Sequence, residues 1–185
     1  MSNGESRSAF ERDVLAGLSA TPKHLSSKYF YDDEGSRLFQ EIMALPEYYL
    51  TACETEIFTE QSGEIVNRLL AEGNAIDIVE LGAGDGVKTA LLLKEVLAKD
   101  SSAKYTPIDI SEVAMTELVE NFRLQLPHLA VEPKVGDYFT ILDEVRKSSQ
   151  RRKAVLFLGS NIGNFDAERT ALFFSSLRAV MNEGD

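Results

Sequence analysis

The chain has 185 residues, enough for one domain with a sizeable core, and 44% of them are hydrophobic. Its 19 basic and 30 acidic residues give a net charge of -11, which argues against nucleic acid or an anionic membrane as the main partner. No apolar run approaches the ~20 residues of a membrane span, and the N-terminus lacks a signal-peptide pattern. Because Cys53 stands alone, we expect a cytoplasmic protein without an internal disulfide.

The first part of the chain is predicted to be helical. Apolar residues recur at helical spacing as far as Pro22, and an aromatic stretch, 28–31, then leads into a second helix that Pro46 interrupts. A longer amphipathic helix follows and ends near Gly73. We therefore expect residues 1–73 to form an N-terminal helical segment packed on the core.

From residue 74 onward, short apolar runs alternate with helical patterns. The expected strands are residues 76–81, 104–110, 131–135 and 154–158. This alternation is typical of an α/β domain with a parallel sheet, here residues 74–185. Pro107, in the second strand, is tolerated only near an edge or an irregularity of the sheet, because proline has no N–H to donate.

A glycine turn follows the first expected strand. Gly82, Gly84 and Gly86 stand at spacing two, and the absence of Cβ atoms lets the backbone approach a ligand closely. A dinucleotide fingerprint has the spacing G-x-G-x-x-G and cradles a pyrophosphate. Here Glu80 and Asp85 would repel a pyrophosphate and would suit the ammonium and sulfonium groups of S-adenosylmethionine. The turn therefore favours a methyl donor, and a tight turn without a ligand is the alternative.

Two further strands also end in carboxylates. In a parallel sheet, ligands bind outside the carboxyl ends of the strands. Asp109 ends the second strand and is placed to accept both hydroxyls of a ribose, although it would also suit the start of a helix that Ser111 caps. Asp137 and Tyr138 end the third strand and offer an acceptor for the exocyclic amine of adenine beside an aromatic ring.

The fourth strand ends differently. Gly159, Asn161, Gly163 and Asn164 supply flexible backbone and amide side chains, without a strong acid or a nucleophile. This composition suits the positioning of an acceptor molecule through hydrogen bonds, and a glycine-asparagine turn without a ligand is the alternative. Catalytic Ser-His-Asp and Cys-His groupings and metal-ligand spacings are absent from the sequence.

Six ordered stretches carry a family resemblance: SKYFYDDEGSRLF, LPEYY, ELGAGDGVKT, YTPIDIS, GDYF and LFLGSNIGNF. Together they resemble the histidine-specific S-adenosylmethionine-dependent methyltransferases of ergothioneine biosynthesis. The resemblance implies a class I methyltransferase (Rossmann-like) parallel sheet and the Nα-trimethylation of histidine. It implies these contacts to the methyl donor: Tyr48, Gly82, Lys88, Asp109, Asp137 and Tyr138. It implies that the amino-acid acceptor is faced by Tyr31, Tyr48, Gly159 and Asn164. No residue has the clear pattern of a general base, and we take Tyr31 as the candidate.

The chain departs from the family pattern in two ways. Asn161 stands where the family often has threonine, which would alter contacts to the acceptor. Family members also continue past residue 185 with further strands and an acceptor domain, so we expect a sheet that is incomplete at its C-terminus. The fourth strand, 154–158, would then be an open edge that favours self-association.

We therefore predict an N-methyltransferase that acts on the α-amine of an amino acid. The expected acceptor is histidine, and the expected cofactor is S-adenosylmethionine. One alternative is a cofactor-binding or interaction fragment without turnover. Another is a nicotinamide-dependent oxidoreductase, which fits the strand–helix alternation but not the acids at Glu80 and Asp85.

Overall fold

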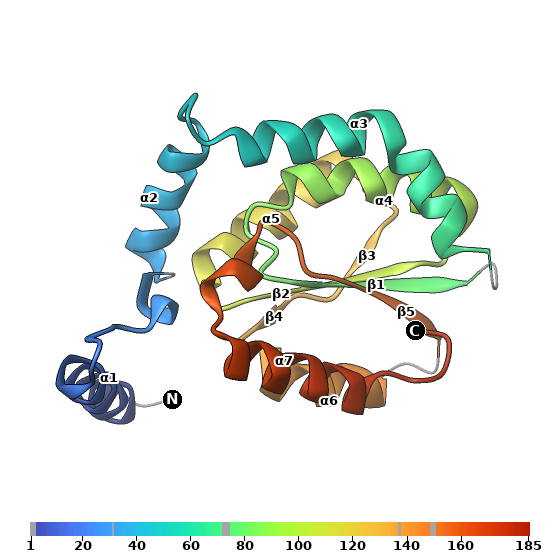
Figure 1. Cartoon of the computed structure of the whole chain (residues 1–185). Helices are drawn as coiled ribbons and strands as arrows, with labels where there is room; N and C mark the ends of the chain where they lie inside the picture. The colour runs from blue at the N-terminus through green and yellow to red at the C-terminus, as the bar shows by residue number, and fades with distance from the viewer. Residues whose placement is uncertain (1–2, 31, 72–74, 137, 149–150) are drawn as a thin grey trace.

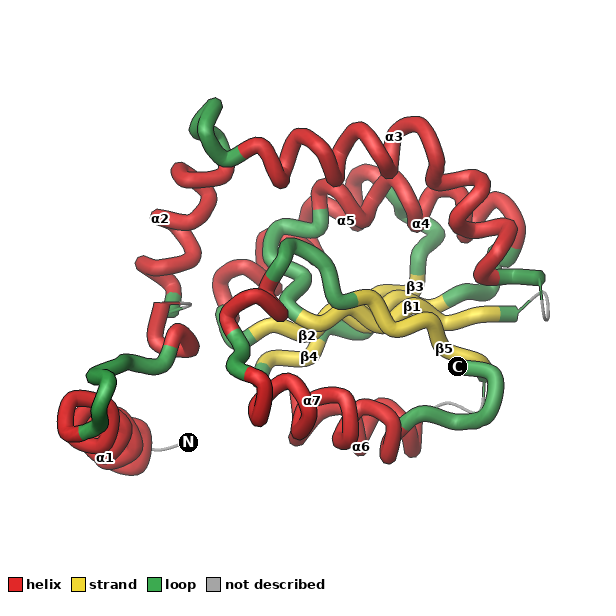
Figure 2. The backbone as a smooth tube through the Cα atoms, in the orientation of Figure 1, coloured by secondary structure: helices red, strands yellow, loops and turns green. Residues whose placement is uncertain are grey.

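The computed structural model describes residues 3–30, 32–71, 75–136, 138–148 and 151–185. A parallel sheet lies between two layers of helices, and an N-terminal helical arm extends to one side (Figures 1 and 2). The helices are α1 (Asn3–Ser19), α2 (Asp33–Met43), α3 (Tyr49–Leu69), α4 (Val87–Lys99), α5 (Glu112–Gln125), α6 (Tyr138–Ser148) and α7 (Ala167–Val180). The strands are β1 (Ile76–Leu81), β2 (Lys104–Asp109), β3 (Ala130–Val131), β4 (Lys134–Val135) and β5 (Arg152–Leu156). Two short 3-10 helices are η1 (Ser27–Phe30) and η2 (Asn161–Asn164).

The sheet has the strand order β3-β2-β1-β5, and β4 also pairs with β2. All described pairings are parallel, with Ile78 of β1 opposite Tyr105 of β2 and Ala154 of β5. Every residue of β1 is buried, because helices cover both faces of the sheet. The predicted α/β fold with a parallel sheet is therefore confirmed.

The predicted third strand, 131–135, is wrong in one respect: the structure divides it into β3 and β4. β2 pairs with β3 through Tyr105 and with β4 through Ile108, so Pro107 lies opposite the break. Proline has no N–H to donate to a neighbouring strand, which explains why pairing lapses there. The expected irregularity beside Pro107 is confirmed.

The fourth strand was predicted at residues 154–158, but β5 runs from Arg152 to Leu156, so the observed strand begins and ends two residues earlier. Lys153 therefore lies inside the strand, and it is buried with 4% of its surface exposed. The carboxylate of Asp185 compensates this burial, because Lys153 N–H donates to it at 2.7 Å and the ammonium lies 3.5 Å away. Within the described residues, β5 pairs only with β1, which leaves it at the edge of the sheet.

Two apolar cores hold the layers together. On one face of the sheet, α3, α4 and α5 form a core to which they contribute Val66, Leu93 and Leu118, all with 0% exposure. On the other face, α6 and α7 pack over β1 and β2, with Phe173 at the centre of an aromatic cluster (Figure 1). Full burial of each such side chain contributes ~1.5–3 kcal/mol, and together these contacts fix the carboxyl ends of the strands relative to one another.

The N-terminal arm consists of α1, η1 and α2, and it makes fewer contacts with the core than α3 does. α1 lies to one side of the sheet domain in Figure 1 and contacts η1, where Tyr29 OH donates to Asp13 at 2.7 Å. The Phe10 and Tyr29 rings meet edge to face at 4.8 Å. α2 then contacts α3 and α5, and α3 packs along α4. None of the described helices is both long and apolar enough to cross a membrane.

Candidate functional site

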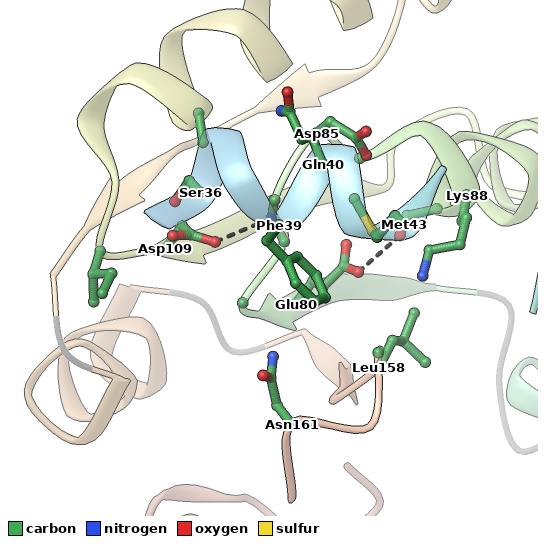
Figure 3. Close-up of a pocket in the computed structure, with 18 of the residues that line it drawn as sticks. Ser36, Phe39, Gln40, Met43, Glu80, Asp85, Lys88, Asp109, Leu158 and Asn161 are labelled. Carbon is green, nitrogen blue, oxygen red and sulfur yellow. Dashed lines mark hydrogen bonds between the residues drawn. The ribbon is translucent and has the colours of Figure 1, made fainter. Parts of the chain in front are cut away.

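A cavity of about 190 Å³ opens at the carboxyl ends of β1, β2 and β5. Three walls come from the sheet: the turn after β1, the end of β2 and the loop after β5. The fourth wall is α2, which contributes Ser36, Phe39, Gln40 and Met43 (Figure 3). The cavity therefore lies at the edge of the sheet where ligands of α/β proteins bind.

The glycine turn needs glycine at each of its three positions. Gly82, Gly84 and Gly86 have φ values of 72°, 55° and 67°, in the left-handed region that other residues rarely adopt. A Cβ at Gly86 would also meet Leu118 and Phe122 at 3.0 Å, so this glycine serves the packing of the turn on α5. A Cβ at Gly84 would meet nothing within 4 Å, and this glycine lines the cavity.

Asp109 joins the end of β2 to this turn. Its Oδ2 accepts the backbone N–H of Gly84 at 3.0 Å, while its Oδ1 accepts the N–H of Ser111 at 3.1 Å. Ser111 in turn caps α5 by accepting the N–H of Ala114. Asp109 thus holds the capping residue Ser111 at the entry to α5 and also lines the cavity, where its carboxylate has acceptor capacity left for a ligand.

Glu80 is a buried acid beneath the turn. Its carboxylate accepts hydrogen bonds from Thr89, at 2.8 Å, and from the hydroxyl of Tyr105 (Figure 3 draws the first). Burial raises the pKa of Glu80 to about 7, and these two hydrogen bonds partly oppose the rise. The carboxyl group therefore changes its charge near neutral pH, directly under the cavity.

Lys88 and Gly159 meet on a residue that the sequence did not single out. The Lys88 ammonium forms an ion pair with Glu54 of α3, and the other carboxylate oxygen of Glu54 accepts the Gly159 N–H at 2.9 Å. Lys88 stands 34 residues from Glu54, and Gly159 stands 105 residues from it. No local pattern on α3 distinguishes Glu54 from the other acids of that helix, which explains why it was missed.

The loop after β5 forms a further wall of the cavity. Gly159 and Ser160 both have left-handed backbones, with φ values of 74° and 61°, and η2 follows. Asn161 lies against the glycine turn, because its amide nitrogen would be 3.1 Å from a Cβ at Gly82. Asn161 and Asn164 both line the cavity.

Most of the predicted site residues come together in this cavity. The lining includes Glu80, Gly82, Gly84, Lys88, Asp109, Tyr138, Gly159 and Asn164. Tyr48, which the structure describes at the start of α3, is not part of the lining; its ring packs edge to face against Phe39 at 5.8 Å. Tyr31 and Asp137 lie outside the described residues.

The cavity also has lining residues that the sequence did not single out as site residues. Phe39 belongs to α2, a helix of the predicted N-terminal helical segment. Arg169 of α7 lines the cavity with its guanidinium 4.9 Å from the centre of the Phe165 ring. Only the helical spacing of Phe39 was visible in the sequence, and helical spacing does not distinguish a core residue from a pocket residue.

The fold is that of a methyltransferase-type α/β protein. It is similar to the structure of a protein of Methanococcus maripaludis presented as a candidate S-adenosyl-L-methionine-dependent methyltransferase, with a TM-score of 0.51 and 16% sequence identity. The likeness covers 82% of this chain and 60% of that one. The profile of the family described as "Histidine-specific methyltransferase, SAM-dependent" matches residues 10–185, and the chain belongs to this family.

Two relatives show the range of acceptors named within this similarity. The chain is 35% identical to a histidine N-alpha-methyltransferase of Mycobacterium tuberculosis over 96% of its own length and 53% of the relative. It is 27% identical to a 4-dimethylallyltryptophan N-methyltransferase of Claviceps fusiformis over 92% of its own length and 48% of the relative. The chain thus spans about half the length of each.

Proposed function

We propose that the chain forms the cofactor-binding half of an S-adenosylmethionine-dependent N-methyltransferase. The enzyme would act on the α-amine of an amino acid, and histidine is the acceptor that we propose. One observation carries this proposal: Asp109 and the acid-flanked glycine turn form one hydrogen-bonded unit at the edge of the cavity. Family membership and the name of the mycobacterial relative support histidine.

The described residues fit the cofactor in charge and shape. Gly84 leaves open space beside the turn, and Asp85 offers negative charge to an ammonium or a sulfonium group, to which Glu80 adds when it ionises near neutral pH. Lys88 supplies the positive charge that a carboxylate of the cofactor needs, and Asp109 is an acceptor for the hydroxyls of its ribose. Asp137 would accept the adenine amine beside Tyr138.

The acceptor would lie against the loop after β5. Gly159 offers its backbone and Asn164 its side-chain amide from this wall, and the ring of Phe39 on α2 lies across the cavity. These groups suit the amino-acid part of an acceptor. The Claviceps relative is named for a different amino-acid-like acceptor. Our choice of histidine as the acceptor therefore rests on the similarity to the histidine methyltransferases and not on contacts within this cavity.

When bound, S-adenosylmethionine supplies a methyl group that an amine lone pair attacks as the C–S bond breaks and its electron pair stays on sulfur. The chain's residues contribute position, which can lower a barrier by ~7–11 kcal/mol. The amine must first lose a proton, because a protonated amine has no lone pair. Thr89 and Tyr105 enclose Glu80, so we assign it an electrostatic role and keep Tyr31 as the proposed base.

Methyl transfer tests the proposal directly. The purified chain is incubated with S-adenosylmethionine and either histidine or tryptophan, and methylated products and S-adenosylhomocysteine are measured by mass spectrometry. Methylhistidine formation supports the full proposal. Cofactor binding without any product favours the alternative of a cofactor-binding fragment without turnover. If the chain neither binds the cofactor nor forms a product, both the proposed function and this alternative are contradicted.

A further inference from the structure

Glu54 connects two walls of the cavity that come from distant parts of the chain. One carboxylate oxygen pairs with the ammonium of Lys88 at the start of α4, and the other accepts the N–H of Gly159 after β5. The side chains of Glu54 and Lys88 are only 25% and 20% exposed, so solvent screens this contact less than an open surface pair. We propose that Glu54 is a positioning residue that couples the cofactor wall to the acceptor wall.

The loop after β5 has a conformation that needs external support. Gly159 and Ser160 are consecutive residues with left-handed backbones. Among the residues that the structure describes, Ser160 is the only one other than glycine with a positive φ. Such a backbone is disfavoured for an L-residue and persists where its surroundings hold it. The hydrogen bond from Gly159 N–H to Glu54 is such a contact, because a carboxylate is a stronger acceptor than water or a neutral amide.

Lys88 gains a defined position from the same carboxylate. An ammonium group has three donors, so the pair with Glu54 leaves donors for the carboxylate of a ligand. Without Glu54, the flexible side chain of Lys88 would have to be ordered by the ligand itself, at a cost in binding free energy. A change at Lys88 also alters the polarisation of the carboxylate whose Oε1 accepts the Gly159 N–H, which makes the two walls dependent on each other.

The role of this link in ligand binding rests on the proposed function, whereas the link itself rests on the described contacts. Glu54 belongs to α3, whose amino end follows α2, the helix that forms the fourth wall. Phe39 and Met43 lie on α2, so that wall is connected to Glu54 along the chain. Two walls of the cavity thus contact this carboxylate directly, through Lys88 and Gly159, and the α2 wall is joined to it through α3.

The link is tested by nuclear magnetic resonance on the protein without ligand. Lys88→Met should move the amide resonance of Gly159 in the unaltered background, because it removes the cation that polarises Glu54. In a Glu54→Gln background, which keeps an acceptor oxygen but no charge, Lys88→Met should leave the Gly159 resonance in place. Equal movement in both backgrounds overturns the link. Glu56→Gln, at an exposed position of the same helix, is the matched control.

Calorimetry with S-adenosylhomocysteine tests the positioning role. Glu54→Gln and Lys88→Met should each weaken binding roughly tenfold, the scale of one charge-assisted hydrogen bond, and the double variant should lose no more than the larger single loss. Full additivity, or unchanged affinity in Glu54→Gln, overturns the role. If the unaltered chain does not bind this ligand, the proposed function and the positioning role fail, while the resonance experiment still decides whether the link exists.

Discussion

Asp109 Oδ2 accepts the backbone N–H of Gly84 at 3.0 Å, and this bond joins the end of β2 to the turn after β1. The turn is also held by Gly82 N–H, which donates to the carbonyl of Ile108 at 2.8 Å. Two adjacent residues of β2 therefore fix the shape of the glycine turn. A loss of the Asp109 carboxylate should loosen the turn and remove a ligand contact at the same time.

Asp109→Ala is expected to weaken the binding of S-adenosylhomocysteine by roughly 1–3 kcal/mol, the cost of a lost charge-assisted hydrogen-bond pair. Isothermal titration calorimetry measures this directly. The control is Asp143→Ala, which removes a carboxylate that pairs with Lys147 on α6, away from the cavity. Equal dissociation constants for the two variants would reduce Asp109 to a residue that starts α5.

Glu80 should make the stability of the protein depend on pH. Its pKa is about 7 in the folded protein and 4.5 in the ordinary state, so the folded protein holds the proton more tightly than the unfolded chain. The stabilising contribution is then fully present below pH 4.5 and is lost as the pH rises to about 7. At about 1.4 kcal/mol per pKa unit, the loss is roughly 3 kcal/mol in the free energy of unfolding.

Glu80→Gln should remove this dependence, because glutamine keeps the shape of the side chain and carries no titrating group. Urea unfolding across the same pH range measures the difference between the variant and the unaltered protein. The free-energy difference should change with pH in favour of the variant as the pH rises. Parallel curves for the two proteins would mean that Glu80 ionises in the folded state as it does in an exposed position.

Asn164→Ala should separate the two ligands of the cavity. We expect the affinity for S-adenosylhomocysteine to stay nearly unchanged, since Asn164 belongs to the loop after β5 and not to the glycine turn. The affinity of the ligand-loaded protein for histidine should fall, because an amide that positions the acceptor is lost. Two calorimetric titrations compare these effects. Similar losses for both ligands would assign the loop after β5 a purely structural role.

The edge of the sheet at β5 is predicted to promote self-association. β5 pairs with β1 on one side, and it contains no proline that would block a further strand. Near the beginning of β5, the Lys153 N–H donates to the side chain of Asp185. This contact does not involve the later residues of the strand. Light scattering should show an average mass that rises with protein concentration. A strict monomer at high concentration would rule out pairing through this edge.

Local patterns in the sequence located the glycine turn and the carboxylates at the strand ends, because these features depend on a few neighbouring residues. Gly82, Gly84 and Asp109 could be assigned to one edge once the sheet was known to be parallel. The division between β3 and β4 could not be read in the same way. It depends on Pro107 in a neighbouring strand, and the pairing of that strand is a tertiary property.

The contribution of the N-terminal helices was harder to predict. Phe39 and Glu54 lie on helices whose patterns are those of ordinary amphipathic segments, and their place at the cavity follows from how α2 and α3 pack. Glu54 meets a partner 105 residues away, so no local spacing signals it. Tyr48 was suggested as a ligand contact by a motif, and its ring packs against Phe39, which lines the cavity; the ligand contact itself stays a prediction.

Ligand preference is the most direct test of the account. We expect calorimetric titration of the chain to give micromolar binding of S-adenosylmethionine or S-adenosylhomocysteine, about −8 kcal/mol, and no measurable binding of NAD or NADP. The physical reason is the carboxylate of Asp85, which attracts a cationic ligand and repels a pyrophosphate, with a partial contribution from Glu80, whose pKa is about 7. Tighter binding of a nicotinamide dinucleotide than of either methionine-derived ligand would contradict it.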